Sequence, residues 1–306
     1  MSAPAVNERL TADRPGSAPP AVHEQSLRRP NQRRRPSGHV LLWTALAVMV
    51  VLYGFPFVYL LLTSFKLPSD AIAIPPHLLP HTWSLTNYGQ ALRTPGVGAA
   101  FVNSLTTAAL STVLSLVLAV PAAWGVTRFG TVSGRVFILA ALVTRMVPPV
   151  AIGIPFVSLM RSLHLNDTPT ALALAHTTIS LPLSIWLLAS FFEAVPVELD
   201  EAARVDGASR LGALVRVVVP VASGGIAVAA IFAFLASWNE FLFALLLTAV
   251  KSQTAPVIIA NFQTQYGLQW GPMTALAAVY SIPVVLLTLF LQRRIVAGLT
   301  LGAVKG

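Results

Sequence analysis

Long apolar stretches recur along the chain and are separated by short polar segments. Four stretches contain no Asp, Glu, Lys or Arg, namely Val40–Phe65, Thr94–Thr127, Thr168–Phe192 and Ser252–Gln292, and two further stretches are interrupted only by Arg145 and Glu240. A helix of about 20 apolar residues is long enough to cross a bilayer. The pattern therefore predicts six transmembrane helices, at about 40–64, 99–126, 136–160, 170–193, 221–248 and 273–292.

The first 38 residues differ from the rest because they are rich in Pro and Arg and almost free of bulky apolar side chains. Such a composition is typical of disorder. We therefore expect two parts: a disordered basic tail at 1–38 and a transmembrane domain at 39–306. The tail lacks the apolar core of a secretory signal, so the first span is expected to stay as an uncleaved anchor.

The positions of the basic residues predict the orientation, since Lys and Arg accumulate in cytoplasmic loops. With the N-terminus inside, the inner segments contain 15 Lys and Arg and the outer segments contain Lys66, Arg93, Arg161 and Lys251. Both termini are thus expected in the cytoplasm. The inner set is Arg9, Arg14, Arg28, Arg29, Arg33, Arg34, Arg35, Arg128, Arg135, Arg204, Arg210, Arg216, Arg293, Arg294 and Lys305.

The composition excludes several classes of protein. Hydrophobic residues make up 55% of the chain and charged residues 10%, against about 25% charged in soluble domains, so a soluble enzyme is not expected. The chain has no cysteine, which excludes disulfides, thiolate metal sites and cysteine nucleophiles. The net charge of +9 comes from topogenic flanks that face membrane lipid, and we expect no binding of nucleic acid.

The predicted cytoplasmic loop 194–220 has a pattern of its own. Pro196 suits the first turn of a helix, and acidic residues follow it, where the helix dipole favours anions. Gly207 is expected to end this helix and Ser209 to cap a second one. Leu199, Ala202 and Ala203 would form a small apolar stripe on the first helix, and Leu211, Leu214, Val215 and Val218 one on the second. Two interpretations are open: the loop docks into another protein, or it packs on its own helices.

The same loop resembles the signature of the membrane subunits of ABC importers. That pattern is E-A-A, three residues, G, nine residues, I-x-L-P, and here it is Glu201-Ala202-Ala203, then Gly207, then Val217-Val218-Val219-Pro220. Val217 and Val219 replace Ile and Leu. Further matches to the carbohydrate branch of the family are TSFK (Thr63–Lys66), NSL (Asn103–Leu105), RMVPP (Arg145–Pro149), DGAS (Asp206–Ser209), WNEFLFAL (Trp238–Leu245) and GLTLGAVKG (Gly298–Gly306).

This resemblance implies an all-α, polytopic fold with six transmembrane helices and the core of the type I importer permeases (MetI-like). It implies a permease subunit of an ATP-driven importer for a sugar or oligosaccharide, in a bacterial plasma (inner) membrane. The expected partners are ATP-binding cassette subunits, a second homologous permease and an extracytoplasmic solute-binding protein. By the resemblance, the residues that couple to the ATPase are Glu201, Ala202, Ala203, Asp206, Gly207, Ala208 and Ser209, and the tail 298–306 reaches the same interface.

The chain itself is not expected to be an enzyme. A phosphate-binding P-loop needs Gly-Lys followed by Ser or Thr, and none of Lys66, Lys251 and Lys305 follows a glycine. ATP and Mg²⁺ should therefore be used by the partner ATPase, with no cofactor on this chain. No catalytic residue and no metal site is expected.

Polar residues inside the predicted spans are candidates for the translocation path, since charges in a membrane are costly. Arg145 precedes Pro148-Pro149, where the helix should unwind. Glu240 is a candidate partner of Arg145, although Arg145 could instead only fix the helices. His176 is expected to be a neutral, packed side chain. The candidates for the path are Asn103, Arg145, Trp238, Asn239 and Glu240.

Two other functions stay open at this level. The same kind of permease could carry a glycerophosphodiester or a polyamine. A secondary transporter driven by an ion gradient would need acidic or His residues in its spans and a repeat architecture, and it would leave the pattern of loop 194–220 unexplained.

Overall fold

The structure is a computed structural model that describes residues 36–129, 132–264 and 267–303, with side chains for 40–129, 133–263 and 267–289. Most of the predicted basic tail at 1–38 lies outside these residues, as do the side chains of the C-terminal segment 298–306. The regular structure in the described residues is helical apart from one short β-hairpin with two residues in each strand. In this hairpin Gln263 pairs with Leu268 and Thr264 with Gly267.

The elements follow one another as α1 (Pro36–Ser64), α2 (Pro68–Ala71), α3 (Thr86–Arg93), α4 (Val97–Arg128), α5 (Val132–Thr144), α6 (Pro149–Ser162), α7 (Pro169–Glu193), α8 (Val197–Val205), α9 (Arg210–Ala213), the π-helical stretch η1 (Leu214–Val218), α10 (Val219–Val221), α11 (Ser223–Trp238), α12 (Leu242–Leu247), α13 (Ala255–Ala260), β1 (Gln263–Thr264), β2 (Gly267–Leu268) and α14 (Trp270–Ala303).

The chain divides into two compact units, Met1–Leu52 and Tyr53–Gly306. The described part of the first unit is the beginning of α1, whose large apolar side chains are exposed from Val40 to Leu52. An exposed apolar helix of this kind is stable only when lipid or another protein covers it. All other elements belong to the second unit.

Four of the six predicted spans are continuous helices long and apolar enough to cross a membrane: Val40–Ser64, Val97–Arg128, Pro169–Glu193 and Trp270–Leu289. They agree with the predicted ranges to within a few residues. Two bent helix pairs are the remaining candidates, so the described residues provide four to six spans.

The predicted helix at 136–160 is broken in the middle. The segments Ser133–Thr144 and Pro149–Ser162 meet at 88°, and Arg145 lies in the break. Proline has no N–H to donate and disfavours helical backbone at the residue before it, so Pro148-Pro149 ends the first helix and starts the second. The expected unwinding beside Arg145 is confirmed, but the continuous helix is not.

The predicted helix at 221–248 is also interrupted. Helical backbone from Arg210 to Val221 turns by 84° into α11, and α11 ends at Trp238. Asn239 and Glu240 lie in the gap before the short helix α12. The candidate fifth span therefore consists of α11 preceded by a bent helical arm from the loop 194–220.

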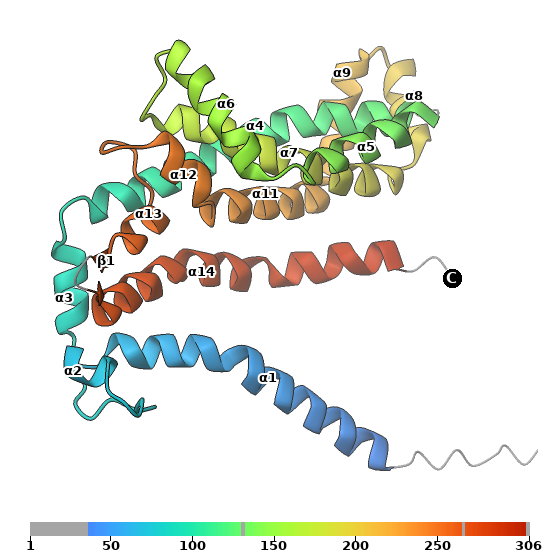
Figure 1. Cartoon of the computed structure of the whole chain (residues 1–306). Coiled ribbons are helices and arrows are strands. Elements are labelled where there is room, and N and C mark those ends of the chain that lie inside the picture. Colours follow the sequence, from blue (N-terminus) through green and yellow to red (C-terminus); the bar gives the residue numbers. More distant parts are fainter. Residues whose placement is uncertain (1–35, 130–131, 265–266, 304–306) are drawn as a thin grey trace, which may run out of the picture. The chain divides into compact units, whose positions relative to one another are not determined.

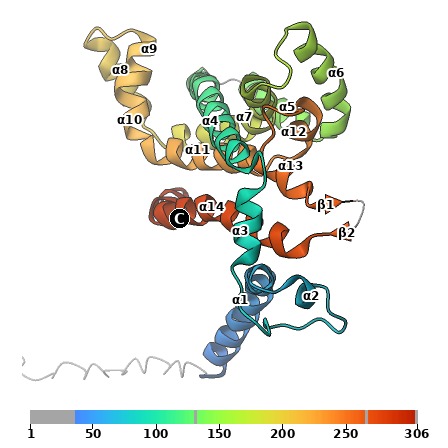
Figure 2. The ribbon, with the colours of Figure 1, turned by 90° about the vertical axis from the view of Figure 1, so that its left-hand side faces the viewer.

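The core of the second unit is the packing of α4, α7 and α11, which lie side by side (Figures 1 and 2). In lipid, helices associate through close contact of small residues rather than through the hydrophobic effect. The Ser115 and Ser180 hydroxyls join α4 to α7 at 2.6 Å. Gly225 of α11 lies so close to Phe191 that an added Cβ would stand 2.3 Å from the ring. The buried small residues of α4 are Ala100, Ser104, Ala108, Ser111, Ser115, Ala119 and Ala123.

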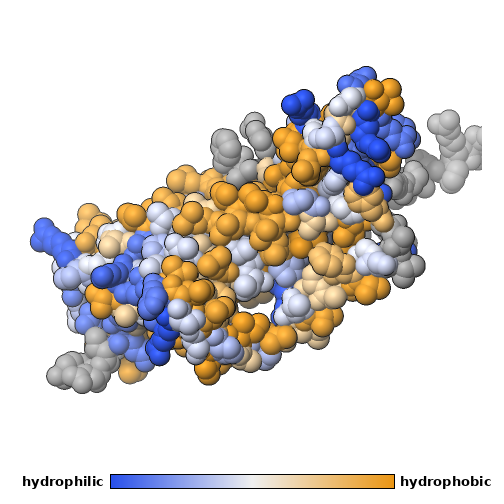
Figure 3. Space-filling view, turned by 90° about the horizontal axis from the view of Figure 1, so that it is seen from above, coloured by the Kyte–Doolittle hydropathy of each residue, from blue (hydrophilic) through white to orange (hydrophobic). Residues whose placement is uncertain are grey.

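Apolar side chains cover the middle of the face drawn in Figure 3, and hydrophilic residues gather toward its two ends. This distribution fits a protein whose middle lies in hydrocarbon and whose ends lie in water. The loop helices α8 and α9 belong to one end, and α2, α3 and the hairpin to the other (Figure 1).

Candidate functional site

The loop between α7 and α11 contains the predicted coupling residues, and its turn is built around Gly207. The helix α8 begins directly after Pro196, which is its N-cap residue and not, as predicted, part of its first turn. At its other end the Ala208 N–H donates to the Ala203 carbonyl at 2.9 Å, and the Gly207 N–H to the Arg204 carbonyl at 3.1 Å. These two bonds form a Schellman motif, which requires a left-handed residue at Gly207, and its φ is +88°. The signature glycine is thus the helix stop.

The second helix of the loop starts as predicted. The Ser209 hydroxyl accepts the Gly212 N–H at 3.1 Å and so caps α9. The helical backbone then continues through the π-helical stretch η1 and α10 to the bend at Ala222. An α-helical face at i, i+3, i+4 and i+7 is therefore not kept along this segment.

The apolar residues of the second helix do not form the predicted single stripe, because two of them are buried and two are exposed. Leu214 and Val218 are buried in the cluster formed with α4 and α7. Leu211 is 65% exposed and Val215 is also exposed, whereas the stripe was expected to lie on one face. In α8, Val205 is 87% exposed. Exposed apolar residues on a polar loop are typical of a contact surface.

We define the coupling knuckle as residues 197–211, which holds all the predicted coupling residues. Glu201, Ala202, Asp206, Gly207 and Ser209 are exposed, and Ala203 and Ala208 are half-buried. The interpretation that the loop packs on its own helices is confirmed for Leu214 and Val218, whereas docking of the exposed knuckle into another protein stays a prediction.

Two arginine contacts hold the knuckle against the end of α4. The Arg128 guanidinium binds the buried Asp200 carboxylate and also donates to the Val195 carbonyl at 2.9 Å. The Arg210 guanidinium lies 4.9 Å from the centre of the Phe129 ring. Sequence analysis had assigned Asp200 only to the helix dipole. The two partners are 72 residues apart, so no local pattern indicates the pair.

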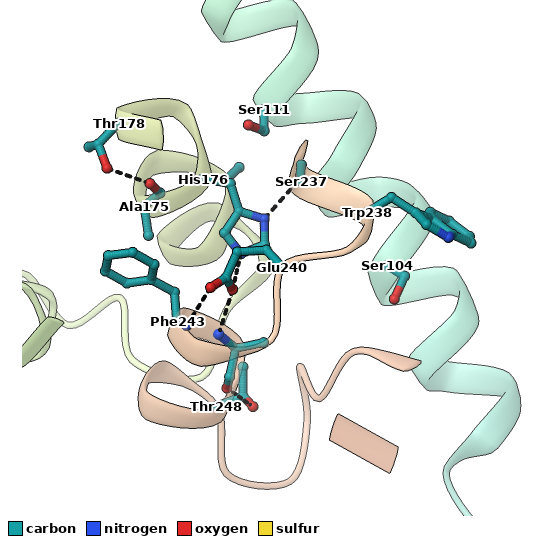
Figure 4. A network of polar contacts seen from close by, with 12 residues as sticks. Ser104, Ser111, Ala175, His176, Thr178, Ser237, Trp238, Glu240, Phe243 and Thr248 are labelled. Carbon is teal, nitrogen blue, oxygen red and sulfur yellow. Dashed lines mark hydrogen bonds and ion pairs between the residues drawn. The ribbon is translucent and has the colours of Figure 1, made fainter. Parts of the chain in front are cut away.

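A second group of polar residues lies inside the bundle, between α7 and the gap after α11 (Figure 4). His176 is 1% exposed, with Nδ1 at 2.7 Å from the Ser237 hydroxyl and Nε2 at 3.1 Å from the Glu240 carboxylate. Glu240 also accepts the N–H groups of Phe243 at 2.9 Å and Ala244 at 3.2 Å. The carboxylate therefore caps α12 and ties it to α7.

His176 is packed, as expected, but it is also a partner of Glu240. The hypothesis that Glu240 pairs with Arg145 is not supported, since Glu240 is already bound on both oxygens. Arg145 is exposed and makes no ion pair among the described residues. It lines a cavity of about 230 Å³ together with Thr144, Thr178 and Phe243.

The other candidates for the translocation path lie in different places. Trp238 and Asn239 line a groove of about 400 Å³, beside Tyr280 and Ser281 of α14. The Trp238 and Tyr280 rings stack at 4.6 Å, and the Tyr280 hydroxyl donates to the Trp238 carbonyl. Asn103 instead donates its amide to the carbonyls of Lys251 and Gln253, so it positions a loop. The complete lining of the groove is Phe57, Trp238, Asn239, Tyr280, Ser281, Val284, Val285, Thr288 and Leu289.

The loop held by Asn103 is also fixed by Asp167, which sequence analysis missed. The Asp167 carboxylate accepts four successive backbone N–H groups, of Ala249, Val250, Lys251 and Ser252, at 3.0–3.2 Å. Partial desolvation raises the pKa of Asp167. The four hydrogen bonds together lower this pKa by more than desolvation raises it, so it lies well below its usual range. The loop between α6 and α7 is thereby joined to the loop after α12.

Comparison with known proteins gives a consistent result. Residues 94–300 match the family described as "Binding-protein-dependent transport system inner membrane component". The chain is 39% identical to the trehalose transport system permease SugB of Mycobacterium tuberculosis, over 86% of this chain and 97% of that one. It is 34% identical to the trehalose/maltose transport system permease MalG of Thermococcus litoralis, over 87% and 97% of the two chains.

A solved structure shares the fold. It is the crystal structure of a bacterial ABC transporter involved in the import of alginate, with a TM-score of 0.70 and 21% sequence identity over 85% of this chain and 97% of that one. The expected all-α importer-permease fold is confirmed by this likeness. The chain belongs to the family of binding-protein-dependent transport system inner membrane components, the non-catalytic, multi-pass permease subunits of ABC importers.

Proposed function

We propose that this permease carries a neutral sugar or oligosaccharide inward and that its coupling knuckle docks on a separate ATP-binding subunit. In the proposed assembly, both termini and the knuckle are cytoplasmic. Two ATP-binding subunits, a second related permease and an extracytoplasmic solute-binding protein complete the transporter. ATP and Mg²⁺ are used by the ATP-binding subunits.

The observation that carries the docking role is the construction of the knuckle. Arg128 and Asp200 fix its base to the membrane helices, while Val205 and Leu211 stay open to a partner. A rigid helix turn with a fixed base transmits the movement of a docked partner to the helices on which it is mounted. The small residues Ala202 and Ala203 allow that partner to approach the backbone closely.

Two observations support a neutral sugar as the solute. The printed names of two relatives, SugB at 39% identity and MalG at 34%, give trehalose and maltose as their solutes. The groove beside Trp238 and Tyr280 is lined by aromatic, aliphatic, hydroxyl and amide side chains, with no charged residue in its described lining. Its volume of about 400 Å³ is within the usual range for small-molecule sites.

The alternative solutes need chemistry that this groove does not offer. A polyamine would require free carboxylates, and Glu240 is occupied by His176 and two backbone N–H groups. A glycerophosphodiester would favour a cation beside its phosphate. Arg145 is the described intramembrane cation, and it lines a different cavity. For these reasons we propose a sugar, and not a polyamine or a glycerophosphodiester, as the solute.

Reconstituted uptake tests the proposal. The permease pair, the ATP-binding subunits and the binding protein are placed in liposomes, and uptake of labelled trehalose, maltose, spermidine and glycerophosphocholine is measured. We expect uptake of a sugar that requires ATP and the binding protein. Uptake by the permeases alone on a proton or sodium gradient would contradict ATP-driven transport. Uptake of spermidine or glycerophosphocholine, without uptake of either sugar, would contradict the proposal that the solute is a sugar.

A point variant tests the groove separately. Asn239→Ala should reduce sugar uptake at least several-fold while ATP hydrolysis by the assembled complex continues, because it removes the amide from the groove lining together with one local hydrogen bond, from that amide to the Leu235 carbonyl at 3.0 Å. Thr106→Ala is a matched control, since Thr106 is an exposed polar residue of α4 outside the groove. Equal uptake by both variants would place the solute elsewhere.

A further inference from the structure

Two histidines and an aspartate converge in the segment between α2 and α3. His77 Nδ1 lies 2.7 Å and His81 Nδ1 2.9 Å from the same Asp70 oxygen. One candidate ligand atom from each of the three side chains lies within 4.8 Å of the other two. The imidazole rings are edge to face, with centroids 4.2 Å apart. Two imidazoles thus face one carboxylate oxygen from different directions.

The residue types match the ligands that Zn²⁺ prefers. Imidazole nitrogens and carboxylate oxygens bind Zn²⁺ at about 2.0–2.2 Å, and sites with three protein ligands leave a fourth position for water. Tetrahedral ligands at that distance are about 3.4 Å from one another. The nitrogen–oxygen distances of 2.7 and 2.9 Å therefore need to lengthen only slightly, by rotation of two side chains.

The surroundings hold the ligands in place. The second Asp70 oxygen accepts the His81 backbone N–H at 3.0 Å, and the buried Lys66 ammonium donates to the His77 carbonyl. Asn87 in turn donates to the Lys66 carbonyl at 2.7 Å. Such outer contacts orient the primary ligands of a metal site.

The site is accessible from water. The Asp70 side chain is 8% exposed, whereas those of His77 and His81 are 40% and 67% exposed. An ion can therefore enter from water on the histidine side.

We propose that Asp70, His77 and His81 form a binding site for one Zn²⁺ ion, which closes the segment 70–81 into a metal-bound loop. The carboxylate oxygen and the two imidazoles are the protein ligands, and water is the fourth. On the proposed topology the site lies outside the membrane on the extracytoplasmic side, away from the coupling knuckle.

Zinc titration of the full-length permease in its assembled, chelator-treated complex tests the site. A chromogenic zinc chelator reports the amount and affinity of bound Zn²⁺. We expect one tightly bound ion per chain in the wild type, and its loss, with at least a 100-fold weaker affinity, in His77→Gln/His81→Gln. His164→Gln is the control, because His164 is an exposed histidine of another loop. Identical titrations for the wild type and the double variant would overturn the proposal.

A measurement on the wild type avoids any folding defect of the variants. Diethylpyrocarbonate modifies exposed histidines, and peptide mass spectrometry reports each position. Equimolar Zn²⁺ should slow the modification of His77 and His81 by about tenfold or more and leave His164 unaffected. Equal rates with and without Zn²⁺ at all three histidines would overturn the proposal.

Discussion

Gly207 carries the turn of the coupling knuckle because its backbone has a φ of +88°, a region that side chains with a Cβ rarely adopt. An added Cβ would meet no atom within 4 Å, so space is not the constraint. The cost of a substitution is conformational, about 1–2 kcal/mol for an ordinary residue and more for a β-branched one.

Gly207→Val should therefore distort the knuckle without unfolding the membrane core. We expect normal insertion into the membrane and at least a tenfold loss of ATP-driven uptake, because the end of α8 and the start of α9 lose their relative geometry. Gly224→Val is the control, since Gly224 lies in α11 with open space around an added Cβ and without a positive φ. Normal uptake by the Gly207 variant would contradict the role of the turn.

The hydrogen bonds of Asp167 lead to a prediction about how the stability of the fold depends on pH. Its folded-state pKa is lowered, so its stabilising contribution is fully present above the pKa of about 3.9 in the unfolded chain and is lost as the pH falls below it. Between pH 5 and 8 this carboxylate should add no pH dependence. Asp167→Ala should lower stability by about 1–2 kcal/mol at pH 7, a figure reduced for solvent exposure.

Thermal unfolding of the purified complex checks this prediction. The difference in melting temperature between the wild type and Asp167→Ala should stay constant from pH 5 to pH 8 and shrink in more acidic buffer. Glu193→Ala, which removes an exposed acid outside the knuckle and without such bonds, should change the melting temperature little. A difference that grows as the pH falls would contradict the assignment.

Single residues were predictable where their chemistry is local. The helix stop at Gly207 and the cap at Ser209 depend on neighbours within five residues, and both are confirmed. Asp167 bonds to a loop more than 80 residues away. Asp70, His77 and His81 lie close in sequence, and their spacing could have been noticed, but only the folded loop aims them at one point.

At the scale of elements, the knuckle depends on the ion pair between Arg128 at the end of α4 and Asp200 in α8. Both side chains are buried, with 7% and 9% exposure. Removing one partner of a buried pair leaves the other charge uncompensated and costs about 3–5 kcal/mol. The pair is therefore expected to hold α8 in a fixed position relative to the end of α4.

Asp200→Asn should loosen the knuckle and weaken binding of the ATP-binding subunits. Co-purification of those subunits with the tagged permease measures the effect, and we expect a several-fold lower yield. Glu193→Gln is the control, since Glu193 is an exposed acid at the end of α7, lies outside the knuckle and has no ion partner among the described residues. Equal yields from the two variants would show that the pair does not support docking.

The broken spans show how far an apolar pattern specifies elements. Hydrophobic length predicted six membrane segments, and Pro148-Pro149 indicated the break in one of them. The bend of 84° at Ala222 follows a π-helical stretch and comes two residues after Pro220, which indicates a turn into the next helix. The packing of Leu214 and Val218 in the cluster with α4 and α7 is contained in no local pattern.

At the scale of the whole molecule, the chain combines a compact bundle with surfaces that a single chain leaves open. Small residues pack α4, α7 and α11 closely, whereas the large apolar side chains of α1 from Val40 to Leu52 are exposed. The second permease and lipid are the expected cover for α1. The coupling knuckle is the expected contact for the ATP-binding subunit, which leaves energy supply to a partner.

The position of the knuckle in the assembled transporter tests the account most directly. The chain has no cysteine, so Val205→Cys provides one thiol on the knuckle and Leu79→Cys one near α2, both at exposed residues. Each thiol is labelled with a photoactivatable crosslinker in a complex that transports, and the adducts are identified by mass spectrometry. The account predicts adducts of the ATP-binding subunit from position 205 and not from position 79. Adducts from position 79 alone would contradict it.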